Sequence, residues 1–255
     1  MFAGNAKRTM SLKMLNVVIA AMVLAVAALI GSPAGFADDN HWVGTWSAAM
    51  QSPLFGAPQS FSGQTLRQVV HVTIGGSVVR VRLSNAQGSQ PLVIGAASLG
   101  IRSTGASVQM GSLRQLTFGG ATSITIPNGA VALSDAVELH IHPQSDLAVS
   151  LFVPNPSLGT TQLTLAHQTS YISPPGDFTG QSSMPVASTT TSWFWLTGIE
   201  VLRSDSSRAV VAFGDSITEG FNSTTDANDR WPDFLARRLL AHPWHPRRGR
   251  AQRGH

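Results

Sequence analysis

The stretch TLRQVVHVTIGGSVVRVRLS, Thr65–Ser84, decides the fold class of this 255-residue chain. Its second half, SVVRVRLS, alternates apolar and polar residues with the period of two that is typical of a strand with one buried face. Gly75 and Gly76 separate this run from the strand-like run before it, which predicts a β-hairpin. Arg80 and Arg82 are then expected on the solvated face.

The same pattern continues on both sides of this stretch. Between His41 and Asp205 no helical period of useful length occurs, and the connections are rich in Pro, Gly, Asn and Ser. Further strand-like runs are Ala136–His142, Leu147–Val153, Thr161–Ala166 and Trp193–Leu202. Many short strands at roughly ten-residue spacing predict a β-sandwich or jelly-roll over residues 38–205.

The N-terminus predicts export. Basic residues precede the apolar run Val17–Ile30, and small residues end the segment at Ala37, which is the pattern of a signal peptide over residues 1–37. The alternative is an uncleaved membrane anchor, for which this run is short. We therefore expect a secreted, periplasmic or extracellular protein with no stable membrane span after cleavage.

The composition narrows the class of protein further. The chain has no cysteine, so in an oxidising compartment it must fold without disulfides. Seven of the 17 Lys and Arg lie in the first 13 residues or the last nine, which leaves ten against all 13 Asp and Glu. The body of the chain is therefore mildly acidic, and nucleic-acid binding is not expected.

The pattern changes after Asp205. AVVAF, Ala209–Phe213, is a continuous apolar run, typical of a strand buried on both faces in a parallel sheet. The loop GDSITEG follows, and then the amphipathic segment Arg230–Ala241, in which Pro232 suits the first helical turn. Strand, turn and helix predict the beginning of an α/β domain over residues 206–240.

Ser216 is the candidate catalytic residue. It lies just past the carboxyl end of the expected strand, where open α/β sheets place their ligands. Gly214 permits a sharp turn there, and with Asp215 it supports a loop in which the Ser216 N–H can point at a developing oxyanion. The alternative is structural, because S-x-x-E beginning at Ser216 is also a capping box whose serine only caps a helix.

A family resemblance rests on several stretches of the chain. AVVAFGDSITEG followed by WPDFLARRL resembles the first conserved block of the SGNH hydrolases, the GDSL-type esterases and lipases. The stretches WVGTWSAAMQSP (Trp42–Pro53), Thr65–Asn85, YISPPGDFTG (Tyr171–Gly180) and WFWLTGIEVL resemble the β-domain that precedes the catalytic domain in one secreted branch of that family.

The resemblance implies a fold and an activity. The fold would be an α+β multidomain chain, a β-sandwich followed by the first β-α unit of a flavodoxin-like α/β/α hydrolase domain. The activity would be serine ester hydrolysis, with Ser216 as the nucleophile and its N–H in the oxyanion hole. It would need no metal and no cofactor, and its substrate would be a small-molecule, carbohydrate or lipid ester.

Other blocks of that family are missing after Ser216: the oxyanion-hole glycine, the G-x-N-D asparagine, and a late D-x-x-H that supplies the base and its orienter. His242 and His245 follow a helix of about ten residues, which places them roughly 15 Å from its start, too far for a catalytic hydrogen bond. The tail, residues 241–255, is basic and without acids, which suggests a truncation or a shifted reading frame; a genuine basic tail is the alternative. We therefore expect an esterase-type chain that lacks activity of its own.

Other side chains suggest weaker alternatives. His140 and His142 share one face of a strand, but no third ligand stands at useful spacing, so no metal site is predicted. His71 and His167 are expected to be hydrogen-bonded structural residues. The aromatic cluster Trp193–Trp195 suggests a sugar-stacking platform, although at least one ring is expected in the core. The alternative function is therefore a secreted β-sandwich binding module, with carbohydrate as a candidate ligand.

Overall fold

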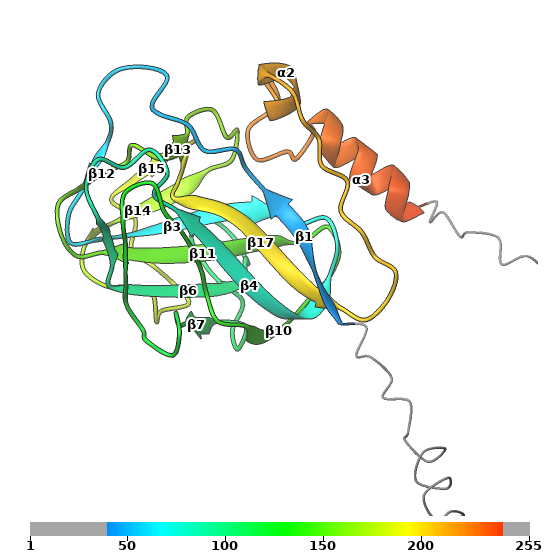
Figure 1. The fold of residues 1–255 in the computed structure, drawn as a ribbon, viewed down its shortest axis with the longest axis horizontal. Helices are drawn as coiled ribbons and strands as arrows, with labels where there is room; N and C mark the ends of the chain where they lie inside the picture. The colour runs from blue at the N-terminus through cyan, green and yellow to red at the C-terminus, as the bar shows by residue number, and fades with distance from the viewer. Residues whose placement is uncertain (1–39, 242–255) are drawn as a thin grey trace, which may run out of the picture. The chain divides into compact units, whose positions relative to one another are not determined.

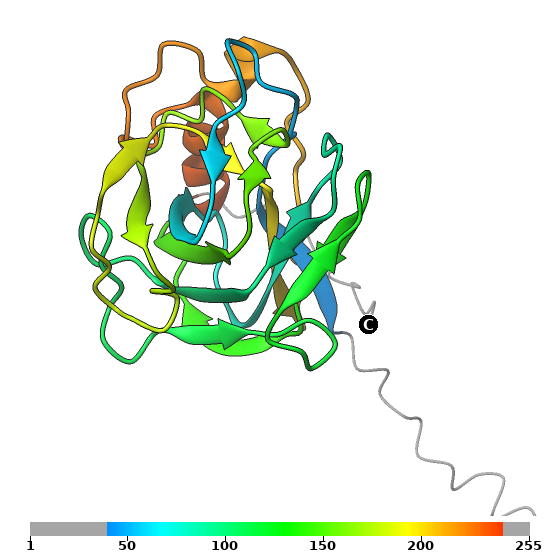
Figure 2. The same cartoon turned by 90° about the vertical axis from the view of Figure 1, so that its left-hand side faces the viewer.

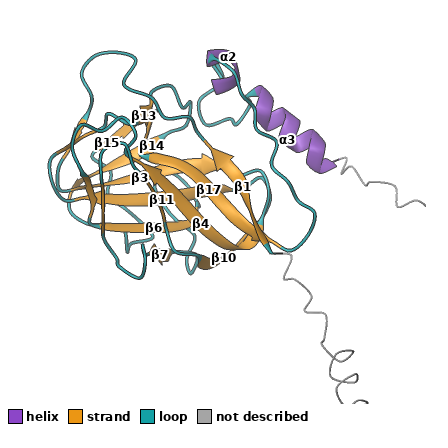
Figure 3. Ribbon diagram, viewed as in Figure 1, coloured by secondary structure: helices purple, strands orange, loops and turns teal. Residues whose placement is uncertain are grey.

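A computed structural model describes residues 40–241, in which antiparallel strands are the main regular secondary structure (Figure 1, Figure 3). The signal peptide predicted over residues 1–37, and the tail beyond Ala241, lie outside the described residues. One sheet has five strands in the order β1, β17, β4 and β10, with β9 also paired to β4. Its strands are β1 (His41–Ser47), β4 (Gly76–Ser84), β9 (Val131–Leu133), β10 (Val137–Ile141) and β17 (Leu196–Arg203).

The second sheet has six strands in the order β15, β14, β3, β11, β6 and β7. Its strands are β3 (Gln64–His71), β6 (Ala96–Ile101), β7 (Arg114–Leu116), β11 (Asp146–Val153), β14 (Ser170–Pro175) and β15 (Ser188–Thr190). Three short pairs complete the β-structure: β2 (Ser60–Phe61) with β12 (Ser157–Leu158), β5 (Leu92–Ile94) with β8 (Ile124–Ile126), and β13 (Gln162–Leu163) with β16 (Trp193–Phe194).

The core lies between the two large sheets, as the crossing of β4 and β17 over β3 and β11 shows (Figure 1). The alternation that predicted β4 is confirmed, because Val79, Val81 and Leu83 are fully buried. Arg80 and Arg82 lie on the other face, where both pair with Glu200 of β17. The antiparallel β-rich part of the predicted fold therefore agrees with the structure.

The hairpin predicted at Gly75 and Gly76 is wrong. β3 pairs with β11 and β14, whereas β4 pairs with β17, β10 and β9, so the connection crosses from one sheet to the other. Glycine is needed there because the chain passes close to β10: a Cβ on Gly75 would lie 2.3 Å from the carbonyl oxygen of Ile141. A glycine pair thus marks a close approach here rather than a tight turn.

The flavodoxin-like α/β/α part of the predicted fold is also wrong. Ala209–Phe213 forms no strand, and every strand pairing within residues 40–241 is antiparallel. The side chains of Val211 and Phe213 are 78% and 99% exposed. The described part of the chain offers this apolar run no parallel strand to pair with, so it stays extended and uncovered.

Two helices follow this extended segment, α2 (Ser216–Glu219) and α3 (Trp231–Ala241). The helix expected over 230–241 is present as α3, with Asp233 in its first turn, but none of its residues is buried. Figure 2, the same fold turned by 90°, shows that the loop around α2 lies at one end of the β-structure. No helix within residues 40–241 is both long and apolar enough to cross a membrane.

Candidate functional site

Ser216 is the first residue of α2, a single helical turn. Asp215 is its N-cap, and the Asp215 carboxylate accepts a hydrogen bond of 3.0 Å from the Ile217 N–H. The capping box that begins at Ser216 is therefore not formed, since the cap lies one residue earlier. The Ser216 side chain is exposed, and none of the described residues hydrogen-bonds its hydroxyl.

Two glycines shape the loop around Ser216. A Cβ on Gly214 would lie 2.2 Å from Oγ1 and 2.9 Å from Cβ of Thr218, so any other residue at Gly214 would displace the Thr218 side chain. Gly220 ends α2 with φ +109°, and a Cβ there would lie 2.4 Å from Cγ of Arg230. The loop thus folds back tightly on both sides of α2.

The connection between α2 and α3 is fastened to the β-structure through Asp226. Its carboxylate accepts three hydrogen bonds of 2.6 Å, from Gln168 Nε2, the Thr169 N–H and the Thr169 hydroxyl. The Asp226 N–H also donates to the carbonyl oxygen of His167. These bonds hold the chain ten residues after Ser216 in a fixed place.

Asp146, at the start of β11, joins the same connection to the six-stranded sheet. It lies 2.7 Å from Nδ1 of His71 and 3.1 Å from an Arg102 nitrogen, and it accepts a longer bond of 3.4 Å from Asn228. Burial raises the pKa of Asp146, but the hydrogen bonds and charges of His71 and Arg102 outweigh it and hold that pKa below its ordinary value. The hydrogen bond expected for His71 is therefore present. In it Asp146 orients the His71 ring as the carboxylate orients the histidine of a catalytic triad.

His167 and Glu219 each have a buried side-chain polar atom. His167 has φ +51°, and its Nε2 has no hydrogen-bond partner among the described residues, so the expectation of a hydrogen-bonded ring is wrong for this atom. Burial lowers the pKa of His167, and the charge of Arg230 lowers it further while Asp229 opposes. Glu219 Oε1 likewise has no partner among residues 40–241, and burial raises the pKa of Glu219.

Gly214 and Asp215 thus lead directly into α2, which begins at Ser216. The described residues offer the Ser216 hydroxyl no hydrogen-bonded base. No hydrogen bond joins Ser216 to a histidine of the described residues. His242 and His245 lie outside those residues. No family model matches the chain, and no curated protein matches it significantly.

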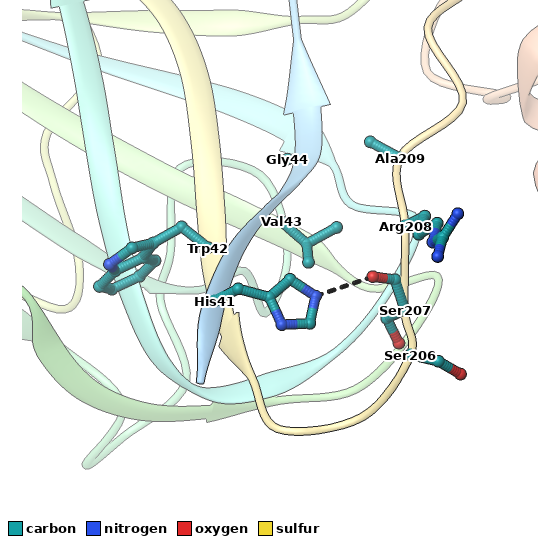
Figure 4. A pocket seen from close by; sticks show the side chains of 8 residues that line it. All are labelled: His41, Trp42, Val43, Gly44, Ser206, Ser207, Arg208 and Ala209. Carbon is teal, nitrogen blue, oxygen red and sulfur yellow. Dashed lines mark hydrogen bonds between the residues drawn. The ribbon is translucent and has the colours of Figure 1, made fainter. Parts of the chain in front are cut away.

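A hollow of about 410 Å³ separates the edge strand β1 from the segment that leads to Ser216 (Figure 4). It is lined by His41, Trp42, Val43, Gly44, Ser206, Ser207, Arg208 and Ala209. His41 Nε2 lies 2.9 Å from the Ser207 carbonyl oxygen, and the Trp42 ring points away from this segment (Figure 4). No sequence signal pointed to this hollow, because periodicity says nothing about which strand edge a linker follows.

The aromatic cluster is part of the core. Trp193, Phe194 and Trp195 are each at most 2% exposed, and Trp193 Nε1 donates to the Val69 carbonyl oxygen over 2.8 Å. The sugar-stacking role suggested for these rings is therefore incompatible with the structure. Nor do residues 40–241 bring three or more His, Cys, Asp or Glu side chains into a group that could hold a metal ion.

Proposed function

We propose that Ser216 is the nucleophile of a serine ester hydrolase of the GDSL type, exported from the cell and acting on a small-molecule, carbohydrate or lipid ester. The observation that supports this most directly is the capping role of Asp215. Because Asp215 caps α2, the Ser216 hydroxyl remains exposed and takes no part in holding the helix. It can approach a carbonyl carbon without first breaking a protein hydrogen bond.

The chemistry needs one more group. In the acylation step Ser216 Oγ bonds to the ester carbonyl carbon, the hydroxyl proton passes to a base, and the alcohol leaves with a proton. Water then hydrolyses the acyl-enzyme. A base must come within about 3 Å of the hydroxyl, and none of the described histidines is bonded to it. We therefore expect the chain to carry the nucleophile but to show no Ser216-dependent turnover by itself.

The test is acylation of the purified chain with p-nitrophenyl acetate in imidazole buffer, where imidazole supplies the base that the described residues lack, followed by peptide mass spectrometry. Ser216 is expected to be acetylated faster than Ser204, which is also exposed but lies outside the motif. Equal labelling of both serines would refute the proposal. Steady-state hydrolysis that disappears in Ser216→Ala would instead show that a base outside residues 40–241 completes the site.

A further inference from the structure

His140 in β10 and His142, which follows directly after the end of this strand, bring their rings together. This strand lies at the edge of the five-stranded sheet, and its alternate residues Leu139 and Ile141 point into the core. Both histidines are exposed. Their ring centroids are 4.9 Å apart and the ring planes are inclined at 89°.

This separation suits two imidazoles that share one metal ion. At a metal–nitrogen distance of about 2.0–2.1 Å, each ring centroid lies roughly 3.2 Å from the ion, so two such ligands at tetrahedral to right angles stand roughly 4.5–5.2 Å apart. The observed 4.9 Å falls within this range. Nearly perpendicular planes also keep the two rings from colliding at a common ion.

Ser77 of β4 supplies the partner that a ligating histidine needs on its other nitrogen. Its hydroxyl oxygen lies 3.3 Å from Nδ1 of His140. When Nδ1–H donates to this oxygen, the lone pair of His140 is on Nε2 and available to a metal. Metal-binding histidines are commonly oriented by such a second hydrogen bond.

The surroundings leave space for a cation, although the guanidinium of Arg114 lies close by, with its Nε donating to the Glu138 carbonyl oxygen over 2.8 Å. Both histidines line an open hollow of about 530 Å³. Arg203 lines the same hollow, but its charge is paired with Asp205 and it donates to the Gly75 carbonyl oxygen. Glu138 lies two residues before His140 on the same exposed face and adds a negative charge nearby.

We propose that His140 and His142 form a two-histidine chelate for a divalent transition ion of the Cu²⁺, Zn²⁺ or Ni²⁺ class, with water in the remaining positions. Imidazole nitrogen suits these ions, whereas Mg²⁺ and Ca²⁺ require oxygen ligands. Sequence spacing placed the two histidines on one face, but only the structure shows the ring separation and the Ser77 contact. The site is independent of Ser216 and of ester hydrolysis.

The test is isothermal titration of the untagged full chain with Cu²⁺ and with Zn²⁺, with electron paramagnetic resonance to detect nitrogen coordination of Cu²⁺. We expect one ion per chain at this site and an affinity lower by roughly tenfold or more in His140→Ala and in His142→Ala. The matched control is His242→Ala/His245→Ala/His255→Ala, which removes the histidines of the tail and should leave this affinity unchanged.

Three results would overturn the site. The first is an unchanged affinity in both single variants. The second is binding that is lost in the tail variant alone, which would assign the ion to the tail. The third is equal affinity for Mg²⁺, which would mean that the imidazoles are not the ligands.

Discussion

Nε of Arg67 donates a hydrogen bond of 2.8 Å to Oγ of Ser150, its direct partner across the β3–β11 pairing, where both residues are completely buried. The terminal nitrogens donate to four main-chain oxygens, those of Ala106, Phe178, Gln181 and Ser182. No carboxylate of the described residues pairs with Arg67, and burial lowers its pKa to about 10. One arginine thus ties β3 to two connecting segments through neutral acceptors.

Arg67→Lys is expected to reduce the free energy of unfolding by about 2–4 kcal/mol. Lysine offers three donors on a single nitrogen, so buried carbonyl oxygens of both segments lose their partner. Urea unfolding of the full chain measures the change. The control is Arg82→Lys, whose side chain is 43% exposed and whose loss should stay within about 1 kcal/mol. Equal losses in the two variants would contradict the structural role of Arg67.

Asp226→Ala is expected to free the connection between α2 and α3 while the sheets stay folded. It removes the acceptor of three hydrogen bonds, so the free energy of local opening of this connection should fall by about 1–3 kcal/mol. Hydrogen exchange of residues 221–230 and of Thr169 should accelerate. Asp229→Ala, which loses one exposed bond of 3.2 Å from Thr224, is the control. Unchanged exchange in Asp226→Ala would show that other contacts hold this connection.

The stability of the chain is expected to fall in acid partly because of Asp146. Its folded pKa lies below the ordinary 3.8, so as the pH falls the unfolded chain takes up this proton first. The contribution is complete above the ordinary pKa and is lost as the pH drops through the folded pKa. Urea midpoints measured between pH 6 and pH 2 should therefore decline less steeply in Asp146→Asn than in the wild type. Parallel curves would assign the acid sensitivity to other carboxylates.

Gly220→Ala is expected to destabilise the Ser216 loop by about 1–3 kcal/mol, because φ +109° strains any residue with a Cβ and the new atom meets Arg230. Gly180→Ala is the matched control, since a Cβ there has nothing within 4 Å and its φ is not in the positive range. Hydrogen exchange across residues 214–221 measures the difference. If both variants behaved alike, the tight fold of this loop would not depend on Gly220.

The sequence predicted the strands whose faces differ in polarity, and it failed where a pattern has two physical meanings. The alternation of Val79, Val81 and Leu83 specifies an inner face whatever the strand order, so β4 could be predicted. Gly75 could not be assigned, because a tight turn and a close approach to Ile141 require the same residue type. The composition of Ala209–Phe213 predicts a buried strand. Its burial, however, depends on neighbouring strands and helices that this run does not specify.

For the candidate site, the sequence predicted a capped helix near Ser216 but not which residue caps it. A polar residue before a helix is a capping signal, and both Asp215 and Ser216 carry it, so local sequence could not decide which of them caps α2. The pairing of His71 with Asp146 joins residues 75 positions apart and needs the β3–β11 register, which sequence alone leaves open.

The hydrogen bonds that Asp226 makes to Gln168 and Thr169 have a consequence for how a complete active site would assemble. Because this carboxylate holds the chain only ten residues beyond Ser216, the distance that Ser216 can move from the sheets is limited by the length of that connection. If Ser216 acts as the nucleophile that we propose, most of the entropic cost of bringing it to a base is that of ordering the segment that carries the base. The rate of acylation should accordingly follow the effective concentration of that segment, as set by the length of whatever chain delivers it.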